Sequence, residues 1–212
     1  MDRICNEALL RKVTTPRAAA AHIKNGMTVG FSGFTVIGYP KVLPAELARR
    51  AEEGEELGIT VITGGNVGDQ LDGVLARSGV MKRRYGFQGN RDLRALANAD
   101  RIQYVDTHVS HGPYLIKNGY LGKIDVAVIE GAVTTEEAAE TVRRARERAG
   151  SVIAIGSCAV TGGIPGMASG DLAGHVEAVY GDAAPDACGD LLAPRPVSDV
   201  IDVDAEVRCC PI

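Results

Sequence analysis

The sequence predicts an α/β fold: a mostly parallel sheet with helices on both faces, followed by a loop-rich C-terminal tail. Short apolar and β-branched runs alternate along the chain with amphipathic segments of about ten to fifteen residues. The run IDVAVI at 124–129 is almost wholly apolar, as a central strand of a parallel sheet should be. Strands that alternate with helices in this way are typical of a parallel sheet covered on both faces.

The front of the chain contains regular helix and strand signals. Thr15 followed by Pro16 is typical of a helix start, and Asn25 followed by Gly26 is typical of a helix end. Further helices and strands are indicated by the spacing of apolar residues between glycine turns. We expect strands at 27–32, 59–63 and 102–106, and helices at 45–53, 70–78, 92–98 and 111–118.

The tail begins with the strand at 124–129 and continues with a long amphipathic helix. This helix is expected at 135–149, with Thr134 or Thr135 as its N-cap and acidic residues in its first turn. A strand at 151–155 follows, and the pattern becomes irregular after Gly156. A helix at 172–180 and a last, edge strand within 200–207 complete the prediction.

Composition and charge exclude several classes of protein. Hydrophobic residues make up 45% and charged residues 24% of the 212 residues, as in a soluble globular protein. A net charge of -4 provides no electrostatic basis for binding nucleic acid. The sequence has no apolar run that could span a bilayer and no apolar signal-peptide core. We therefore expect a cytoplasmic protein with reduced cysteines.

Two glycine-rich turns follow predicted strands, GFTVIGYP at 33–40 and TGGNVG at 63–68. A turn between a strand and a helix exposes backbone N–H groups at the carboxyl edge of the sheet, where α/β proteins bind anionic or carbonyl ligands. Neither turn matches a dinucleotide-binding or P-loop motif. Glycine also serves the geometry of any such turn, so the spacing leaves a ligand role and a purely structural role open.

The run NGMTVGFSGFTVIGYPKVLP and the sequence that follows it resemble the N-terminal domain of the acetyl-CoA hydrolase/transferase family, which includes succinyl-CoA:acetate CoA-transferases. The resemblance is collinear and covers about residues 3–130. It implies that a coenzyme A thioester is the substrate. It also implies binding roles for residues of the two glycine turns: Gly33, Phe34, Gly38, Pro40, Gly64 and Gly65.

The family's chemistry is nucleophilic. A glutamate attacks the acyl-CoA thioester, and amide N–H groups stabilise the oxyanion. In the family this glutamate lies in the second half of a much longer chain, so no nucleophile can be assigned here. The resemblance therefore predicts the acyl-CoA-binding part of a CoA-transferase or acyl-CoA hydrolase, which is inactive without a second domain.

Two further groups in the front have alternative interpretations. Glu130 ends the strand at 124–129 and could replace the missing nucleophile, or it could stand at the mouth of the sheet without any chemistry. His108 and His111 are three residues apart and could ligate a metal or act as a base. The alternative is a cluster at a helix start, with Asp106 or Ser110 as the cap.

The motif GSCAVTGGIP at 156–165 and the final residues RCCPI resemble the small, electron-transferring subunit of nickel–iron hydrogenases and the related 20 kDa subunit of respiratory complex I. The resemblance covers about residues 124–212. It implies that Cys158 and Cys210 are ligands of a [4Fe–4S] cluster, and that a large catalytic subunit is the partner. A cluster normally takes four thiolates. The family's first two come from an N-terminal Cys-x-x-Cys, and the front of this chain occupies that place, so the ligand set is incomplete.

The two resemblances divide the chain into a CoA-transferase-like module at 1–130 and a hydrogenase-small-subunit-like segment at 124–212 that continues the same sheet. The two segments share the strand at 124–129. A parallel strand at this place is compatible with both resemblances, because both families are parallel α/β proteins. Three functions remain open. The chain is an acyl-CoA-binding module, an iron–sulfur electron-transfer subunit of a hydrogenase-like complex, or a hybrid sequence that folds without either activity.

Overall fold

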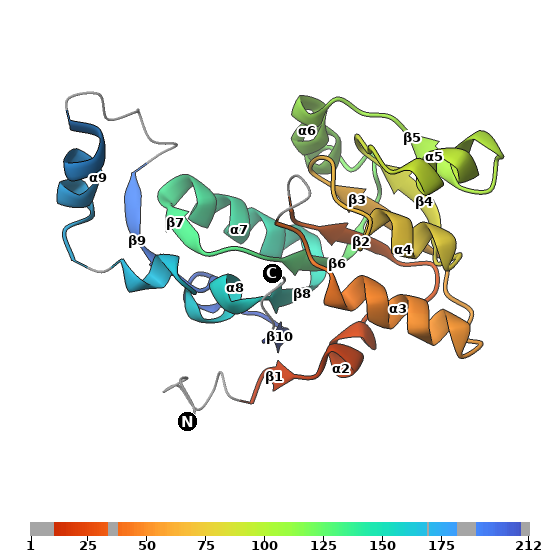
Figure 1. The fold of residues 1–212 in the computed structure, drawn as a ribbon, viewed down its shortest axis with the longest axis horizontal. Coiled ribbons are helices and arrows are strands. Elements are labelled where there is room, and N and C mark those ends of the chain that lie inside the picture. Colours follow the sequence, from red (N-terminus) through yellow and green to blue (C-terminus); the bar gives the residue numbers. More distant parts are fainter. Residues whose placement is uncertain (1–10, 34–37, 169, 182–189, 209–212) are drawn as a thin grey trace.

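The computed structural model describes residues 11–33, 38–168, 170–181 and 190–208. Within these ranges, an eight-stranded sheet has the order β1-β10-β8-β6-β2-β3-β4-β5, and every neighbouring pair is parallel (Figure 1). The predicted, mostly parallel α/β sheet is thereby confirmed. Its strands are β1 (Val13–Thr14), β2 (Thr28–Phe31), β3 (Ile59–Thr63), β4 (Met81–Tyr85), β5 (Gln103–Val105), β6 (Ile124–Ile129), β8 (Ala149–Ile155) and β10 (Ala205–Val207).

Helices connect these strands and cover both faces of the sheet (Figure 1). Several of them begin directly after a capping residue. The side chains of Thr15, Asn90 and Thr135 each accept a hydrogen bond from the first turn of a helix. The helices are α2 (Pro16–Ala20), α3 (Val42–Glu52), α4 (Asp72–Arg77), α5 (Arg91–Asn98), α6 (Gly112–Lys117), α7 (Glu136–Arg148), α8 (Ser157–Thr161) and α9 (Leu172–Tyr180). None of the helices in the described ranges is long and apolar enough to cross a membrane.

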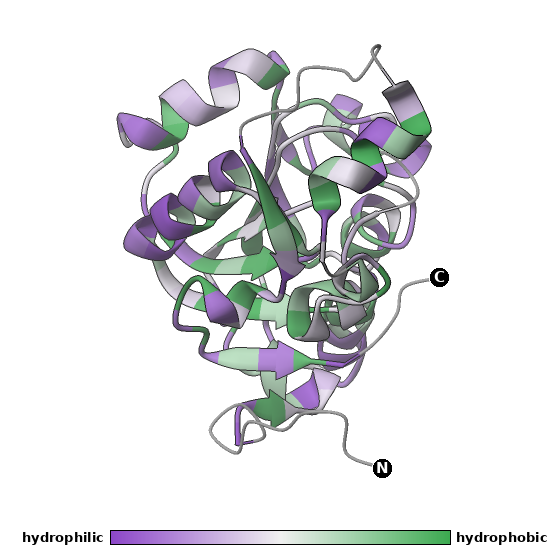
Figure 2. Ribbon diagram, turned by 90° about the vertical axis from the view of Figure 1, so that its left-hand side faces the viewer, coloured by the Kyte–Doolittle hydropathy of each residue, from purple (hydrophilic) through white to green (hydrophobic). Residues whose placement is uncertain are grey.

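Two apolar cores lie on opposite faces of the sheet. The first core contains residues of α2, α3 and α4, and it receives side chains from β2, β3, β6, β8 and β10. The second core contains residues of α7 and α8, and all of its members come from residue 124 onward. Figure 2 shows the hydrophobic strands between more hydrophilic helices. The tail therefore builds one core by itself and also completes the core of the front.

Strand β6 links the two cores through the alternation of its side chains. Val126 and Val128 are buried in the first core, whereas Ala127 and Ile129 pack against the second. β6 pairs with β2 on one side and with β8 on the other. This explains why IDVAVI lacks polar alternation: both faces of the strand are covered.

Strand β4 is not indicated by the sequence pattern. Its residues MKRRY contain three consecutive cations, which is unusual for an interior strand. Arg84 is nevertheless fully buried, because its guanidinium pairs with the fully buried carboxylate of Asp72. A buried ion pair therefore replaces the apolar residue that pattern reasoning requires.

The end of the chain differs from the expected edge strand. β10 lies between β1 and β8, so the prediction of an edge position is wrong. The two-residue strand β1 covers it, and two residues are too few for a strand signal in the sequence. Residues Val197–Asp199 form a short 3-10 helix before β10. A separate antiparallel pair joins β7 (Val133–Thr135) to β9 (Leu191–Arg195).

Candidate functional site

The strand order reverses between β2 and β6. The chain adds β3, β4 and β5 on one side of β2, returns with β6 on its other side, and continues outward with β8 and β10. In open α/β sheets, the crevice outside the carboxyl ends of the strands at such a reversal is the usual ligand site. The two chain segments that leave the sheet there begin at Ser32 and Glu130.

Backbone and side-chain hydrogen bonds hold these two segments side by side. The amide of Ser32 donates to the Val128 carbonyl over 2.9 Å. The amide of Glu130 donates to the Ser32 hydroxyl over 2.8 Å. The backbone of Glu130 is thereby held beside Ser32 at the reversal point.

Gly38 lies against this carboxyl group. A Cβ atom at Gly38 would stand 3.3 Å from Oε1 of Glu130, which is tighter than ordinary contact. Glu130 is half-buried, and this burial raises the pKa of its carboxyl group, whereas the charge of Lys41 partly opposes the shift. The structure thus brings together the sequence-predicted Gly38 and the alternative candidate Glu130. The predicted Pro40, two residues after Gly38, is also buried.

Tyr39 connects the two glycine turns. Gly33 has φ +128, and a Cβ atom there would lie 2.7 Å from the Cβ of Tyr39. In the second turn, a Cβ atom at Gly68 would lie 2.2 Å from the Tyr39 hydroxyl oxygen. The buried phenol therefore fits only because both positions are glycine. Its hydroxyl lies 3.4 Å from Oε1 of Gln70, and burial raises the pKa of Tyr39. The predicted Phe34 lies outside the described residues.

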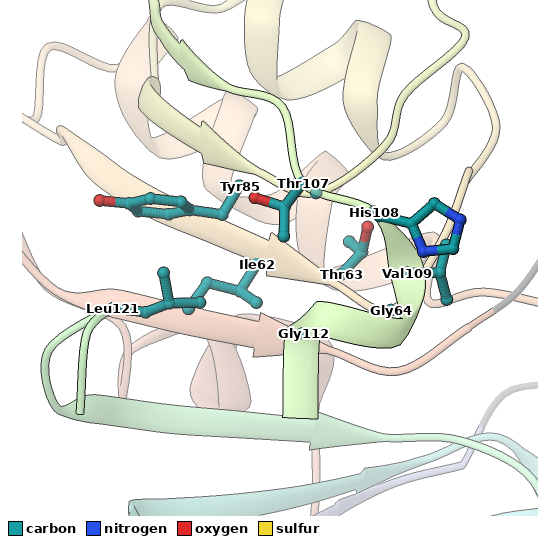
Figure 3. Close-up of a pocket in the computed structure, with 10 residues that line it drawn as sticks. Ile62, Thr63, Gly64, Tyr85, Thr107, His108, Val109, Gly112 and Leu121 are labelled. Atoms are coloured by element: carbon teal, nitrogen blue, oxygen red, sulfur yellow. The ribbon is translucent and has the colours of Figure 1, made fainter. Parts of the chain in front are cut away.

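The second turn is tied to the buried arginine of β4. The Thr63 hydroxyl donates to the Gly65 carbonyl over 2.6 Å and accepts from Nη2 of Arg84 over 2.6 Å. Gly64 lines a hollow that also contains Tyr85, Thr107 and His108 (Figure 3). This hollow has a volume of about 20 Å³, room for about one water molecule and far too small for an acyl-CoA. The roles predicted for Gly64 and Gly65 in ligand binding remain predictions.

The two histidines form a short capped turn. His108 precedes the 3-10 helix Val109–His111, and its Nδ1 accepts a hydrogen bond from the amide of Ser110. The cap is thus His108 itself rather than Asp106 or Ser110. The rings of His108 and His111 are 6.0 Å apart in an edge-to-face arrangement. Across the described ranges, no three His, Cys, Asp or Glu residues are grouped closely enough to hold a metal ion.

Cys158 stands in the first turn of α8, directly after β8. Gly156 precedes it with φ +89, and the thiol packs so closely on Gly163 that a Cβ atom there would lie 2.6 Å from Sγ. Cys158 is the one thiol within the described residues. Cys210 and the other three cysteines lie outside them. One thiol does not satisfy a [4Fe–4S] cluster, so the described residues do not fit that group.

Sequence reasoning missed Tyr39 and Arg84 as residues that organise the site. Tyr39 carries no signal of its own, because its partners Gly33 and Gly68 become neighbours only in the folded sheet. Arg84 lies in a charged run that resembles solvent-exposed sequence. A buried partner for it, Asp72, could have been sought in the neighbouring helix.

Two family models match the chain. The model described as NADH ubiquinone oxidoreductase, 20 Kd subunit, matches residues 90–212, which is more than half of the chain. The model described as Coenzyme A transferase matches residues 13–93. Both resemblances predicted from the sequence are therefore confirmed.

Curated relatives fall into the same two groups. Succinyl-CoA:acetate CoA-transferase of Clostridium kluyveri is 41% identical over 136 residues, covering 64% of this chain and 25% of that protein. Sulfhydrogenase 2 subunit delta of Pyrococcus furiosus is 38% identical over 89 residues, covering 42% of this chain and 36% of that protein. The chain thus spans about a quarter of the CoA-transferase relative and about a third of the sulfhydrogenase subunit.

The fold as a whole resembles a solved structure. RipA from Yersinia pestis matches 96% of this chain and 44% of its own chain, with a TM-score of 0.59 and 19% identity. At this identity the likeness concerns the fold alone. Because more than half of its residues match the first model, the chain belongs to the family of the NADH ubiquinone oxidoreductase 20 Kd subunit, and its front is related to the coenzyme A transferases.

Proposed function

We propose that the chain binds an acyl-coenzyme A thioester between the carboxyl ends of β2 and β6, as the ligand-binding part of a CoA-transferase or acyl-CoA hydrolase type of protein. The observation that carries this proposal is the reversal of strand order, where Gly33 packs on Tyr39 and Gly38 lies against the carboxyl group of Glu130. The printed name of the Clostridium kluyveri relative supports the substrate class.

The chemistry of these groups suits a thioester. Glycine at position 38 lets a ligand approach the backbone and the Glu130 carboxyl group closely. Burial raises the pKa of Glu130, and in its protonated form this carboxyl group can donate a hydrogen bond to a carbonyl oxygen. We assign no nucleophile, so the proposal is for binding by a module that needs a second domain for transfer.

Isothermal titration with acetyl-CoA tests this proposal. We expect saturable binding with a dissociation constant below about 1 mM. Gly38→Val should abolish it, since the new side chain would occupy the space in front of Glu130. Gly166→Val is the matched control, because Gly166 lies in the tail and a Cβ atom there would make only ordinary contact, with its nearest atom at 3.6 Å, so this variant should bind as the unaltered chain does. Absence of binding at several millimolar ligand would reject the proposal.

We further propose that residues 1–130 and 124–212 are the two modules of the chain and that β6 belongs to both. In support, β6 pairs with β2 of the front and with β8 of the tail. Its alternating side chains also reach both cores.

An iron–sulfur electron-transfer role is the second candidate, favoured by the family match over residues 90–212 and by Cys158 in its glycine turn. Anaerobic reconstitution with iron and sulfide tests it. A brown protein whose colour is lost in Cys158→Ser would support a cluster, and a colourless, iron-free product would reject it. If neither acetyl-CoA nor iron binds, the chain is a hybrid sequence that folds without either activity.

A further inference from the structure

Glu206 lies in the middle of β10 and points into the second core. In register, it stands between Val13 of β1 and Ala154 of β8. Its neighbours Ala205 and Val207 belong to the first core, so the alternation of the strand turns Glu206 to the other face. Ala154 is a member of the second core, which places the carboxyl group beside apolar residues.

The carboxyl group of Glu206 is fully buried and unsatisfied. The residue has 0% exposure, and neither Oε1 nor Oε2 has a hydrogen-bond partner among the described residues. The hydroxyl of Ser198, in the 3-10 helix next to β10, is also buried, and it lies near enough to favour the ionised carboxyl group without making a hydrogen bond of ordinary geometry. An ionised carboxylate in such surroundings is unfavourable, because no well-formed hydrogen bond from the described residues replaces its hydration.

The charges that face Glu206 do not offset this burial. Lys12, which precedes β1, and Arg208, which follows β10, favour the ionised form, and so does the Ser198 hydroxyl. Asp199 in the 3-10 helix opposes it, and Lys12 is itself paired with Asp202. The residues that β8 and α8 contribute nearby are uncharged, as in Ala154 and the sequence SCAVT. Burial is the largest cause, and it raises the pKa of Glu206 above its ordinary value of 4.5.

The backbone next to Glu206 borders a short edge strand. β1 consists of two residues and, within the part of the chain that the structure describes, pairs only with β10. The amide of Glu206 donates to the Lys12 carbonyl over 3.1 Å, so the backbone of Glu206 itself helps to hold β1. A short outer strand of this kind opens at a much lower cost than the interior of the sheet.

We propose that Glu206 is a proton-dependent latch on the β1–β10 edge: the edge is closed while the carboxyl group holds its proton and opens when the proton leaves to solvent. Ionisation requires water at the carboxylate, and water can reach it only if β1 or the 3-10 helix separates from β10. Opening separates β1 from β10, together with the short segment that joins β1 to α2.

The sign of the effect follows from the raised pKa. Below the ordinary glutamate value, both closed and open forms hold the proton, and the edge has its full stability. As the pH rises, the open form loses its proton first, so the open population increases by up to about tenfold per pH unit. The increase ends when the pH passes the raised pKa of the closed form.

Amide hydrogen exchange followed by mass spectrometry from about pH 5 to about pH 9 tests the latch. After correction for intrinsic exchange, peptides that cover residues 11–14 and 205–208 should lose protection as the pH rises. A peptide that covers β3 should not change. Glu206→Gln cannot ionise, so it should keep the edge protected at every pH. Glu177→Gln, at an exposed position on α9, is the matched control and should behave like the unaltered chain.

Ser198→Ala provides a second, independent measurement. The Ser198 hydroxyl favours ionised Glu206, so removing it raises the pKa of the closed form, and the loss of protection should continue to a higher pH. The latch is overturned if the unaltered chain shows no pH-dependent exchange at this edge, or if Glu206→Gln retains that dependence. Should Glu206→Gln fail to fold, the Ser198→Ala result decides: a loss of protection that ends at the same pH as in the unaltered chain, or at a lower one, rejects the latch.

Discussion

The strands β4 and β10 differ in how their buried charges are satisfied. In the front, the guanidinium of Arg84 donates to Asp72 and to Thr63, so that every member of this buried group has a partner. In the tail, both oxygens of the equally buried Glu206 lack one. A buried network whose hydrogen bonds are all made stabilises one conformation. A buried carboxyl group without hydrogen bonds instead favours separation of the strands beside it, because separation exposes the group to water. The front edge is therefore suited to hold a ligand, and the tail edge to move.

The largest expected effect comes from breaking the network of the front. Arg84→Met leaves the Asp72 carboxylate buried without its partner, and we expect a loss of about 3–5 kcal/mol in the free energy of unfolding. Urea denaturation measures this. Arg143→Met removes an exposed arginine that pairs with Glu136, and it should leave the midpoint unchanged. Equal effects of the two variants would show that the buried network does not stabilise the front.

A smaller effect is expected where Tyr39 joins the two glycine turns. In Gly68→Ala the new Cβ would lie 2.2 Å from the Tyr39 hydroxyl oxygen, so the ring must shift at a cost of about 1–3 kcal/mol. Denaturation of the single variant and of Gly68→Ala combined with Tyr39→Phe measures the cost. The double variant should recover part of the loss, because it removes the atom in closest contact. A loss that is identical in both backgrounds would contradict this packing.

The smallest effect is expected from removing the N-cap of α7 in the tail. The Thr135 hydroxyl accepts a hydrogen bond from the Ala138 amide over 3.1 Å and caps α7. Thr135→Ala should therefore reduce the free energy of unfolding by about 1 kcal/mol. Thr134→Ala removes a neighbouring hydroxyl that does not cap the helix. If thermal denaturation shows a larger loss for Thr134→Ala, the cap has been assigned to the wrong residue.

The sequence was most informative where burial and pattern agree. β3 and β6 were predicted with correct bounds because apolar, β-branched residues fill them, and α9 has the expected range. β4 could not be predicted, since its run of charged residues, which includes the buried Arg84, has the pattern of a solvent-exposed segment. β1 is two residues long, and it forms a strand through its pairing with β10, which no local pattern predicts. The proximity of Gly38 and Glu130 depends on the strand order, which no local pattern contains.

Hydrogen exchange with and without acetyl-CoA tests most directly whether the reversal between β2 and β6 is the functional edge. The account predicts that the ligand slows exchange in peptides that cover residues 28–33, 38–41 and 126–131. Peptides that cover α8 and β10 should be unchanged, because α8 follows β8, and β8 and β10 lie beyond β6 on the tail's side of the reversal. Slower exchange around α8 with none at the reversal, or no ligand-dependent change at all, would contradict it.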